Sequence, residues 1–264
     1  MAEEAADIPA VAAEGSDMPD LSIIVPAYKE GEHIYDSIRE IADTIEAAGI
    51  DYEVLAVNDG SPDNTGSEIA RAAETNPRIR DCGYDVNRGK GGAILHGIEC
   101  SKGRIVGFID ADLELPAKLI PVFYIEMCNS GDDVVIGSKM HKDSHIEYPP
   151  LRRFVSWGYY MMLKILFGLK CKDTQTGIKL YRGDLLRAIG KVQQVRGYAF
   201  DIEELALANS TGAVIKEMPV EVHFSRKGSF SRISFGAIFR MFCDSIKIWW
   251  DLRIRKRYKL DLGS

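Results

Sequence analysis

Short apolar runs alternate with helical patterns over the first half of the chain. Runs rich in Val and Ile indicate buried strands, and apolar residues that recur every three or four positions indicate helices with one buried face. The expected strands are LSIIVPA (21–27), YEVLAVND (52–59), RIVGFID (104–110) and DVVIGS (133–138). The helical stretches between them are 32–48, 65–74 and 90–102. This alternation predicts parallel strands joined by right-handed crossovers, so we expect an α/β fold with an open sheet.

Two longer apolar segments stand out in the second half of the chain. The first (148–170) opens with a proline pair that suits a helix start, and Lys164 is its only charge between Phe154 and Leu169. The second repeats apolar residues at helical spacing and runs into the basic stretch RIRKRYK. Its apolar stripe consists of Phe235, Ile238, Phe239, Phe242, Ile246, Trp249 and Trp250. Both segments predict amphipathic helices, and neither is long enough to span a bilayer.

Composition divides the chain into three parts. Residues 1–20 hold six acids, no base and two prolines, so we expect a disordered acidic leader. Residues 21–231 are interpreted as one α/β domain, in which 151–169 forms an amphipathic interface helix. Residues 232–264 are expected to form the C-terminal amphipathic helix and a basic tail.

The cysteines and the charge exclude several classes of protein. Five cysteines without a C-x-x-C pair suit neither a disulfide framework nor a structural zinc site, so we interpret them as reduced thiols in a cytosolic setting. The N-terminus lacks the basic and then apolar pattern of a secretory signal. The net charge of −6 and the lack of interleaved base-stacking motifs argue against a nucleic acid as partner.

Four carboxylates follow the predicted strands at the points where those strands end. Glu30 comes after the first strand, Asp59 after the second, and Asp110 and Asp112 after the third. In open α/β sheets the ligand crevice lies beyond the carboxyl ends of the strands, so these acids are expected to converge there. The pair Asp110 and Asp112 suits Mg²⁺ or Mn²⁺ with a diphosphate completing the coordination shell. By itself, the pair fits the cap of a following helix equally well.

Two further motifs carry turn and phosphate chemistry. In VNDGSPDNT (57–65), the residues after Asp59 predict a turn and a helix start near Asn64 or Thr65, while Asp59 has the position to accept N–H groups of a nucleotide base. NRGKGGA (87–93) is a glycine-rich turn that opens a helix, with Lys90 available for phosphate. It matches neither the Walker pattern nor G-x-G-x-x-G, which disfavours a kinase or a dinucleotide-binding protein.

Taken together and in this order, IIVPAYKE, VNDGSPDNT, NRGKGGA and DADLELP resemble the nucleotide-sugar domain of family 2 glycosyltransferases with the GT-A fold. That fold is Rossmann-like, with a mixed, mostly parallel sheet flanked by helices. The later segments IGSK, PLRRFVSWGYYMMLKILFGLKCKDTQTGIKLYR and FDIEELALA are similar to those of polyprenyl-phosphate (dolichyl-phosphate) sugar synthases. The resemblance covers residues 21 to about 231 and implies that this region is a catalytic domain.

The resemblance also implies roles for individual residues. The donor nucleotide sugar would be held by Pro26, Tyr28, Glu30, Asp59, Lys90 and Asp110. The metal, Mg²⁺ or Mn²⁺, would be held by Asp110, Asp112 and Gln175. The acceptor phosphate would be held by Lys139, Arg152, Ser156 and Arg226. Asp110, Asp112, Lys139, Arg152 and Gln175 form the expected catalytic set.

Three of these positions leave alternatives open. Lys139 stands where the family usually has Arg, which keeps the charge but loses the bidentate fork. Gln175 suits sugar hydroxyls or metal as well as an ordinary loop hydrogen bond. Asp201 and Glu203 suit solvated acids at a helix start, although the family places an acid here near the donor sugar.

The function that the resemblance implies is metal-dependent, inverting transfer of a sugar to polyprenyl phosphate. UDP-glucose is the first candidate donor, because KDTQTGIKLYR is more similar to the glucosyl branch, and GDP-mannose and UDP-N-acetylhexosamine follow. The alternative is a family 2 enzyme with a water-soluble or polysaccharide acceptor.

A lipid acceptor would require the enzyme to meet a membrane. We therefore expect the two apolar helices and the basic tail to make the protein peripheral on the cytoplasmic face. The alternative for the same stripe is packing in the core or contact between copies in an oligomer.

Overall fold

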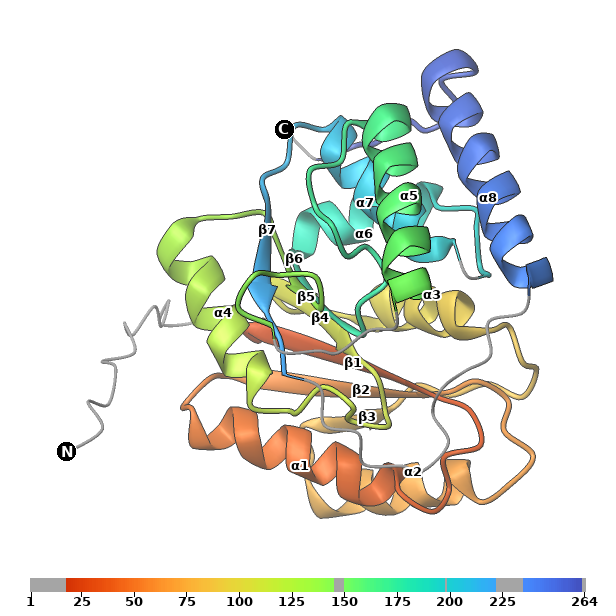
Figure 1. Cartoon of the computed structure of the whole chain (residues 1–264). Coiled ribbons are helices and arrows are strands. Elements are labelled where there is room, and N and C mark those ends of the chain that lie inside the picture. The colour runs from red at the N-terminus through yellow and green to blue at the C-terminus, as the bar shows by residue number, and fades with distance from the viewer. Residues whose placement is uncertain (1–17, 145–149, 198, 222–234, 263–264) are drawn as a thin grey trace.

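One mixed sheet of seven strands forms the centre of the structure, a computed structural model (Figure 1). The structure describes residues 18–144, 150–197, 199–221 and 235–262, and within 150–157 and at 235 and 237–239 it describes the helix but not the side chains. The strands are β1 (Leu21–Ala27), β2 (Tyr52–Asn58), β3 (Ile79–Asp81), β4 (Ile105–Ile109), β5 (Val134–Ser138), β6 (Ile178–Arg182) and β7 (Ile215–Pro219).

The strands are arranged in the order β3-β2-β1-β4-β6-β5-β7. Every pairing in the sheet is parallel except the two pairings of β6, which runs antiparallel to β4 and β5. The expected α/β fold and its mostly parallel sheet are therefore confirmed. Because β6 runs in the opposite direction, its first residues meet the carboxyl ends of its neighbours at one edge.

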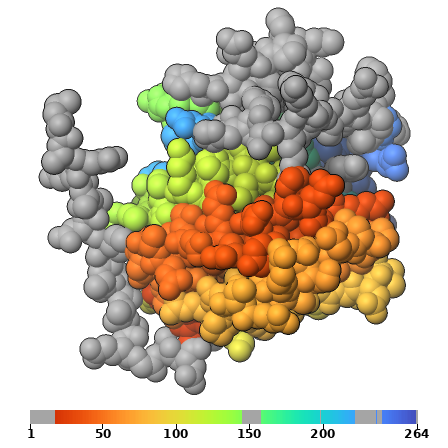
Figure 2. All heavy atoms as spheres, turned by 90° about the horizontal axis from the view of Figure 1, so that it is seen from below, coloured from red at the N-terminus to blue at the C-terminus, as the bar shows by residue number. Residues whose placement is uncertain are grey.

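Helices cover both faces of the sheet. They are α1 (Ile34–Ala47), α2 (Thr65–Thr75), α3 (Lys90–Cys100), α4 (Leu119–Ser130), α5 (Pro150–Phe167), α6 (Gly183–Val192), α7 (Phe200–Ser210) and α8 (Phe235–Trp249), and a π-helical turn (Trp250–Ile254) follows. The helices α1, α2 and α4 share one apolar core with the sheet, and α3, α5, α6, α7 and α8 share the other. Figure 2 shows the first face, where the red and orange part of the chain, which includes α1 and α2, forms much of the surface.

The pattern of apolar positions located the four expected strands and the three expected helices to within a few residues. It missed β3, which has only three residues, and β6 and β7. In β6 the run of apolar residues is interrupted by Lys179, which the structure buries completely. A charge inside a strand hides the strand from a search for apolar runs.

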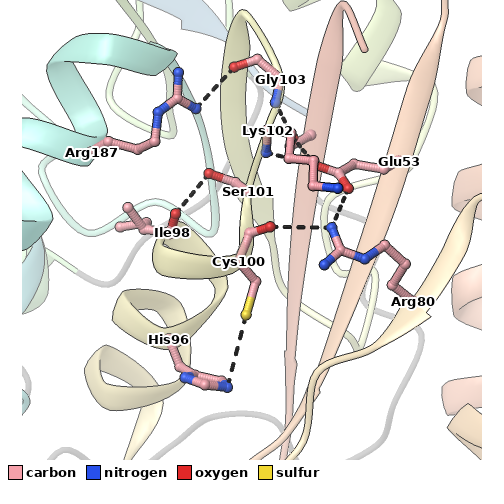
Figure 3. Close-up of polar contacts among 10 residues, drawn as sticks. Glu53, Arg80, His96, Ile98, Cys100, Ser101, Lys102, Gly103 and Arg187 are labelled. Carbon is pink, nitrogen blue, oxygen red and sulfur yellow. Dashed lines mark hydrogen bonds and ion pairs between the residues drawn. The ribbon is translucent and has the colours of Figure 1, made fainter. Parts of the chain in front are cut away.

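A hydrogen-bonded carboxylate organises the edge of the sheet opposite the carboxyl ends (Figure 3). The buried Glu53 on β2 accepts the hydroxyl of Ser22 and the N–H of Lys102, both at 2.7 Å, and pairs with Arg80. Ser22 in turn accepts the N–H of Gly103 at 2.7 Å. These bonds fix the turn between α3 and β4 to β1 and β2, so the register of β4 is set from this edge.

The C-terminal helix turns part of its apolar surface outward. Met241, Ser245 and Ile248 face the core, and the hydroxyls of Ser245 and Tyr159 lie 3.1 Å apart between α8 and α5. In the predicted stripe, Phe242, Ile246 and Trp250 are instead 41–47% exposed, whereas Trp249 is half-buried. Each of these three core-facing residues directly precedes a residue of the stripe, so the buried face of α8 is turned away from the predicted one, and Phe242, Ile246 and Trp250 face outward.

The chain around the domain boundaries is partly described. Residues 1–17 of the expected leader lie outside the described residues, but Pro19 and Asp20 accept the backbone N–H groups of Arg104 and Ile105. At the other end, the basic tail returns to the core, where Tyr258 is half-buried. Of the helices in the described ranges, none combines the length and the apolar character that crossing a membrane requires.

Candidate active site

A tight turn holds Asp110 and Asp112 at the carboxyl end of β4. The N–H of Asp110 donates to the carbonyl of Gly177 at 3.1 Å, and its own carbonyl accepts the N–H of Leu113 at 3.2 Å. Leu113 has a left-handed backbone (φ 50°), and Oδ1 of Asp112 accepts the N–H of Glu114 at 3.2 Å. The next helix, α4, begins only at Leu119, and its N-cap position is occupied by Lys118. The two aspartates are therefore not the cap of that helix.

Lys90 faces this pair from the first residue of α3. Its ammonium lies 2.5 Å from Oδ1 of Asp110. Burial by itself lowers the pKa of Lys90, but the charges of Asp110 and Asp201 outweigh it and raise the pKa above its usual value. The side chain therefore carries a full positive charge at the edge of the sheet.

The environment of Asp112 fits a divalent cation. Burial raises its pKa, and the charges of Asp110, Glu114 and Glu30 add to this shift, so three further carboxylates lie near enough to act on Asp112. Gly177 leaves room beside the pair, because a Cβ at this position would lie 2.4 Å from Oδ2 of Asp110. One or two carboxylates, together with the phosphates of a substrate, are the usual ligands of Mg²⁺ in proteins.

The expected base-binding residues lie next to this pair, at the ends of β1 and β2. Pro26 is half-buried in β1, and Tyr28 just beyond the strand is 43% exposed. Glu30 lies just before the turn that leads into α1: its N–H donates to the hydroxyl of Thr65 at 2.9 Å, and its carbonyl accepts the N–H groups of His33 and Ile34. The charge of Glu30 contributes to the raised pKa of Asp112, so these two acids lie at the same edge of the sheet.

Asp59 at the end of β2 is 3% exposed and extensively hydrogen-bonded. Its Oδ1 accepts the hydroxyl of Tyr84 at 2.7 Å and the backbone N–H of Arg88 at 2.6 Å. Its carbonyl accepts Nδ2 of Asn87 at 3.1 Å. The residues after Asp59 form the predicted turn, and α2 starts at Thr65 as expected.

The residues assigned to the acceptor are described only in part. Lys139 follows β5, and its N–H donates to Oδ2 of Asp173 at 2.8 Å. Burial raises the pKa of Asp173, and the charge of Lys139 opposes this shift. Arg152 and Ser156 lie on the first half of α5, where side chains are not described, and Arg226 lies outside the described residues.

Gln175 precedes β6 at the same edge of the sheet as Asp110. Its side chain is exposed, and Nε2 lies 3.3 Å from Sδ of Met241 on α8. Gln175 thus links the outer helix to the loop that carries Gly177.

The two acids of α7 are buried, so they are not the solvated helix-start acids that the sequence also allowed. Asp201 pairs with the fully buried Lys179 on β6, and Glu203 accepts the N–H groups of Gln194 and Val195 and the hydroxyl of Tyr258. Sequence reasoning missed Tyr84, Lys179 and Tyr258. A lysine inside the apolar run of β6 was the one local signal that pointed to a buried acid as its partner.

The mixed, mostly parallel sheet flanked by helices matches that of solved GT-A glycosyltransferases. Glucosyl-3-phosphoglycerate synthase from Mycobacterium tuberculosis, solved with Mn²⁺, UDP and phosphoglyceric acid, superimposes with a TM-score of 0.62 at 20% identity and covers 92% of this chain and 80% of its own. Mannosyl-3-phosphoglycerate synthase from Rubrobacter xylanophilus gives a TM-score of 0.63 at 17% identity, over 93% and 77% of the two chains. These likenesses establish the GT-A fold.

The sequence places the chain more narrowly. The profile described as "Glycosyl transferase family 2" matches residues 22–190. Dolichyl-phosphate beta-glucosyltransferase of Dictyostelium discoideum is 30% identical over 258 residues, which is 92% of this chain and 76% of that protein. Dolichyl-phosphate beta-glucosyltransferase ALG5A of Trichomonas vaginalis is 32% identical over 238 residues, or 86% and 72% of the two chains. The chain belongs to glycosyl transferase family 2, and the protein is a glycosyltransferase.

Proposed function

We propose that this glycosyltransferase moves a sugar, glucose in the first place, from a nucleotide sugar to a polyprenyl phosphate such as dolichyl phosphate. The main structural support is that Lys90, Asp110 and Asp112 lie close together at the carboxyl edge of the sheet. The likeness to dolichyl-phosphate beta-glucosyltransferases extends over 92% of the chain and supports the acceptor.

Asp110 and Asp112 are the residues that would hold Mg²⁺ or Mn²⁺, with Gln175 as the neighbouring neutral ligand. When bound, such a cation neutralises charge on the diphosphate as it departs from the sugar. Lys90 supports the same step because its ammonium is held at the edge by Asp110 and stands at the N-terminus of α3, where backbone N–H groups also favour anions.

The acceptor needs no strong general base, since a phosphate monoester is already an anion near neutral pH. The task of the protein is therefore to hold two anions in line, the diphosphate on one side of the anomeric carbon and the acceptor phosphate on the other. Lys139 lies at the edge of the sheet beyond β5, and we assign it to the acceptor phosphate. Arg152, Ser156 and Arg226 are assigned to the same acceptor phosphate. Direct displacement in this geometry inverts the configuration at the anomeric carbon.

The exposed apolar residues Phe242, Ile246 and Trp250, which we call the outward row of α8, form the surface that we assign to the lipid. Phe242, Ile246 and Trp250 are exposed, and the exposed cations Arg253 and Lys256 follow them closely in the chain. An apolar helical row bordered by cations suits the headgroup region of an anionic membrane leaflet. We therefore place the protein peripherally on a cytoplasmic membrane face, and contact between copies through this row is the competing arrangement.

A donor and acceptor panel tests the proposal. The protein is incubated with Mn²⁺ and with UDP-glucose, GDP-mannose or UDP-N-acetylglucosamine, each with a short polyprenyl phosphate or with 3-phosphoglycerate, and the products are identified by mass. We expect a glycolipid from UDP-glucose. Product only on 3-phosphoglycerate would favour the water-soluble acceptor, and no product with any donor would overturn the proposal.

A further inference from the structure

The loop after β3 is built against Asp59. The backbone of Tyr84 continues the sheet, because its N–H donates to the carbonyl of Asn58 at 3.1 Å and residues 59 and 84 form a parallel bridge. Gly60 has a left-handed backbone (φ 62°), and a Cβ there would lie 2.6 Å from the backbone nitrogen of Asn87. The crossing leaves no room for a side chain at position 60, so the close approach of the loop to the turn after β2 depends on this glycine.

This loop donates hydrogen bonds to one carboxylate oxygen of Asp59, Oδ1, and none to the other, Oδ2. Each carboxylate oxygen accepts two hydrogen bonds, and Oδ1 takes both of its own from Tyr84 and Arg88. Among the described residues, Oδ2 receives no hydrogen bond. The guanidinium of Arg88 also lies 4.1 Å from the centre of the Tyr84 ring, and the ring of His96 meets it edge-on at 5.3 Å, which fixes the phenol.

Candidate bases differ in the number of donors that they offer to a carboxylate. Uracil presents a single ring N–H between two carbonyl groups. Guanine presents a ring N–H beside an amino group, a pair of parallel donors that a carboxylate meets best with one oxygen for each donor. A carboxylate that is 3% exposed and has one oxygen already saturated matches the single donor of uracil.

We infer that Tyr84 is a specificity-determining residue: by holding Oδ1 of Asp59, it makes this carboxylate a one-point acceptor that selects a uracil base over a guanine base. The inference rests on the proposed function, because it concerns the donor of that reaction. Tyr84 itself acts through Asp59 and is a positioning residue.

The experiment measures dissociation constants of UDP and GDP in the presence of Mn²⁺, by calorimetry, for the wild-type protein and for Tyr84→Phe. Removing the hydroxyl frees a lone pair on Oδ1 for the second donor of guanine and loosens the carboxylate that uracil meets. We expect the preference for UDP over GDP to fall roughly ten-fold, as for the loss of one hydrogen bond to a charged group. The KM for the UDP-sugar should rise while kcat stays unchanged.

Two controls make the result specific. Tyr52→Phe removes a hydroxyl that lies 3.4 Å from a carboxylate oxygen of Glu46, at the opposite end of β2, and should keep the wild-type preference. UDP methylated at N3 lacks the ring N–H, so it should bind the wild-type protein more weakly than UDP.

Three results would overturn the inference while the proposed function stands. They are an unchanged preference in Tyr84→Phe, an equal loss in Tyr52→Phe, and equal binding of UDP and its N3-methyl derivative. A wild-type protein that binds no nucleotide would overturn the proposed function itself.

Discussion

The ammonium of Lys90 lies 2.5 Å from Oδ1 of Asp110, and this ion pair ties the first residue of α3 to the carboxyl end of β4. The two residues are brought together because α3 and β4 are consecutive elements that run in opposite directions, so the start of α3 lies at the same edge of the sheet as the end of β4. Asp112, two residues on, has no comparable cation beside it among the described residues. Substitution of Asp112 therefore tests the metal site more directly than substitution of Asp110, which would also break the ion pair with Lys90.

Replacing Asp112 by Ala is expected to reduce sugar transfer at least roughly a hundred-fold, because it removes an oxygen ligand from the candidate metal site. The fold should persist, since Asp112 lies in a turn and not in the core. Initial rates and the rise of the melting temperature with Mn²⁺ measure the two effects. Asp43→Ala, on the exposed face of α1, is the matched control, and substantial turnover by the Asp112 variant would remove the metal assignment.

Lys179 should prove structural, and costly to remove. Lys179→Met leaves the carboxylate of Asp201 buried without its cation, which typically destabilises a protein by about 3–5 kcal/mol. Urea unfolding followed by circular dichroism measures the loss. Replacing both partners at once, with Lys179→Met and Asp201→Leu, is expected to recover most of it, and a single variant as stable as the wild type would contradict the role of the pair.

The buried Glu204 predicts how stability depends on pH. Burial, together with the charge of Asp201, raises its pKa to about 8, above the ordinary value of 4.5 that applies in the unfolded chain. Between these values the folded protein binds a proton that the unfolded chain has lost. The free energy of unfolding should therefore fall as pH rises from about 4.5 through about 8, by at most ~1.4 kcal/mol per pH unit from this group.

Glu204→Gln tests this dependence, because the amide keeps the shape of the carboxyl group and does not titrate. Unfolding by urea at several pH values should give a shallower fall for this variant than for the wild type. Glu40→Gln, on the exposed side of α1, should retain the wild-type slope. Parallel slopes for Glu204→Gln and the wild type would exclude Glu204 as the titrating group.

The outward row of α8 is expected to carry membrane binding. Changing Phe242, Ile246 and Trp250 to Ser should weaken flotation with anionic vesicles, roughly ten-fold or more for each large side chain that enters the lipid. Val122→Ser, an exposed apolar position on α4, should float like the wild type. If the triple variant also floats unchanged, or if its main effect is to dissociate an oligomer, the row does not contact lipid.

The main strands and the position of the crevice could be predicted from the local pattern of apolar and polar residues. Apolar runs must be buried and must end where the chain meets water, so the alternation of runs fixed the main strands, and the acids at their ends marked the crevice. Glu30, Asp110 and Asp112 could be placed together for that reason alone. The resemblance of four ordered motifs then supplied the chemistry that spacing left open between a helix cap and a metal site.

The tertiary structure decided what depends on partners far apart in the chain. The direction of β6, the burial of Lys179 against Asp201, and the outward turn of Phe242 and Ile246 have no local signature, because each depends on which elements pack together. The bond from Tyr84 to Asp59 spans 25 residues and exists only because β2 and β3 are neighbours. Periodicity states which face of an element is buried, whereas the identity of the facing side chain is set by the packing of the whole sheet.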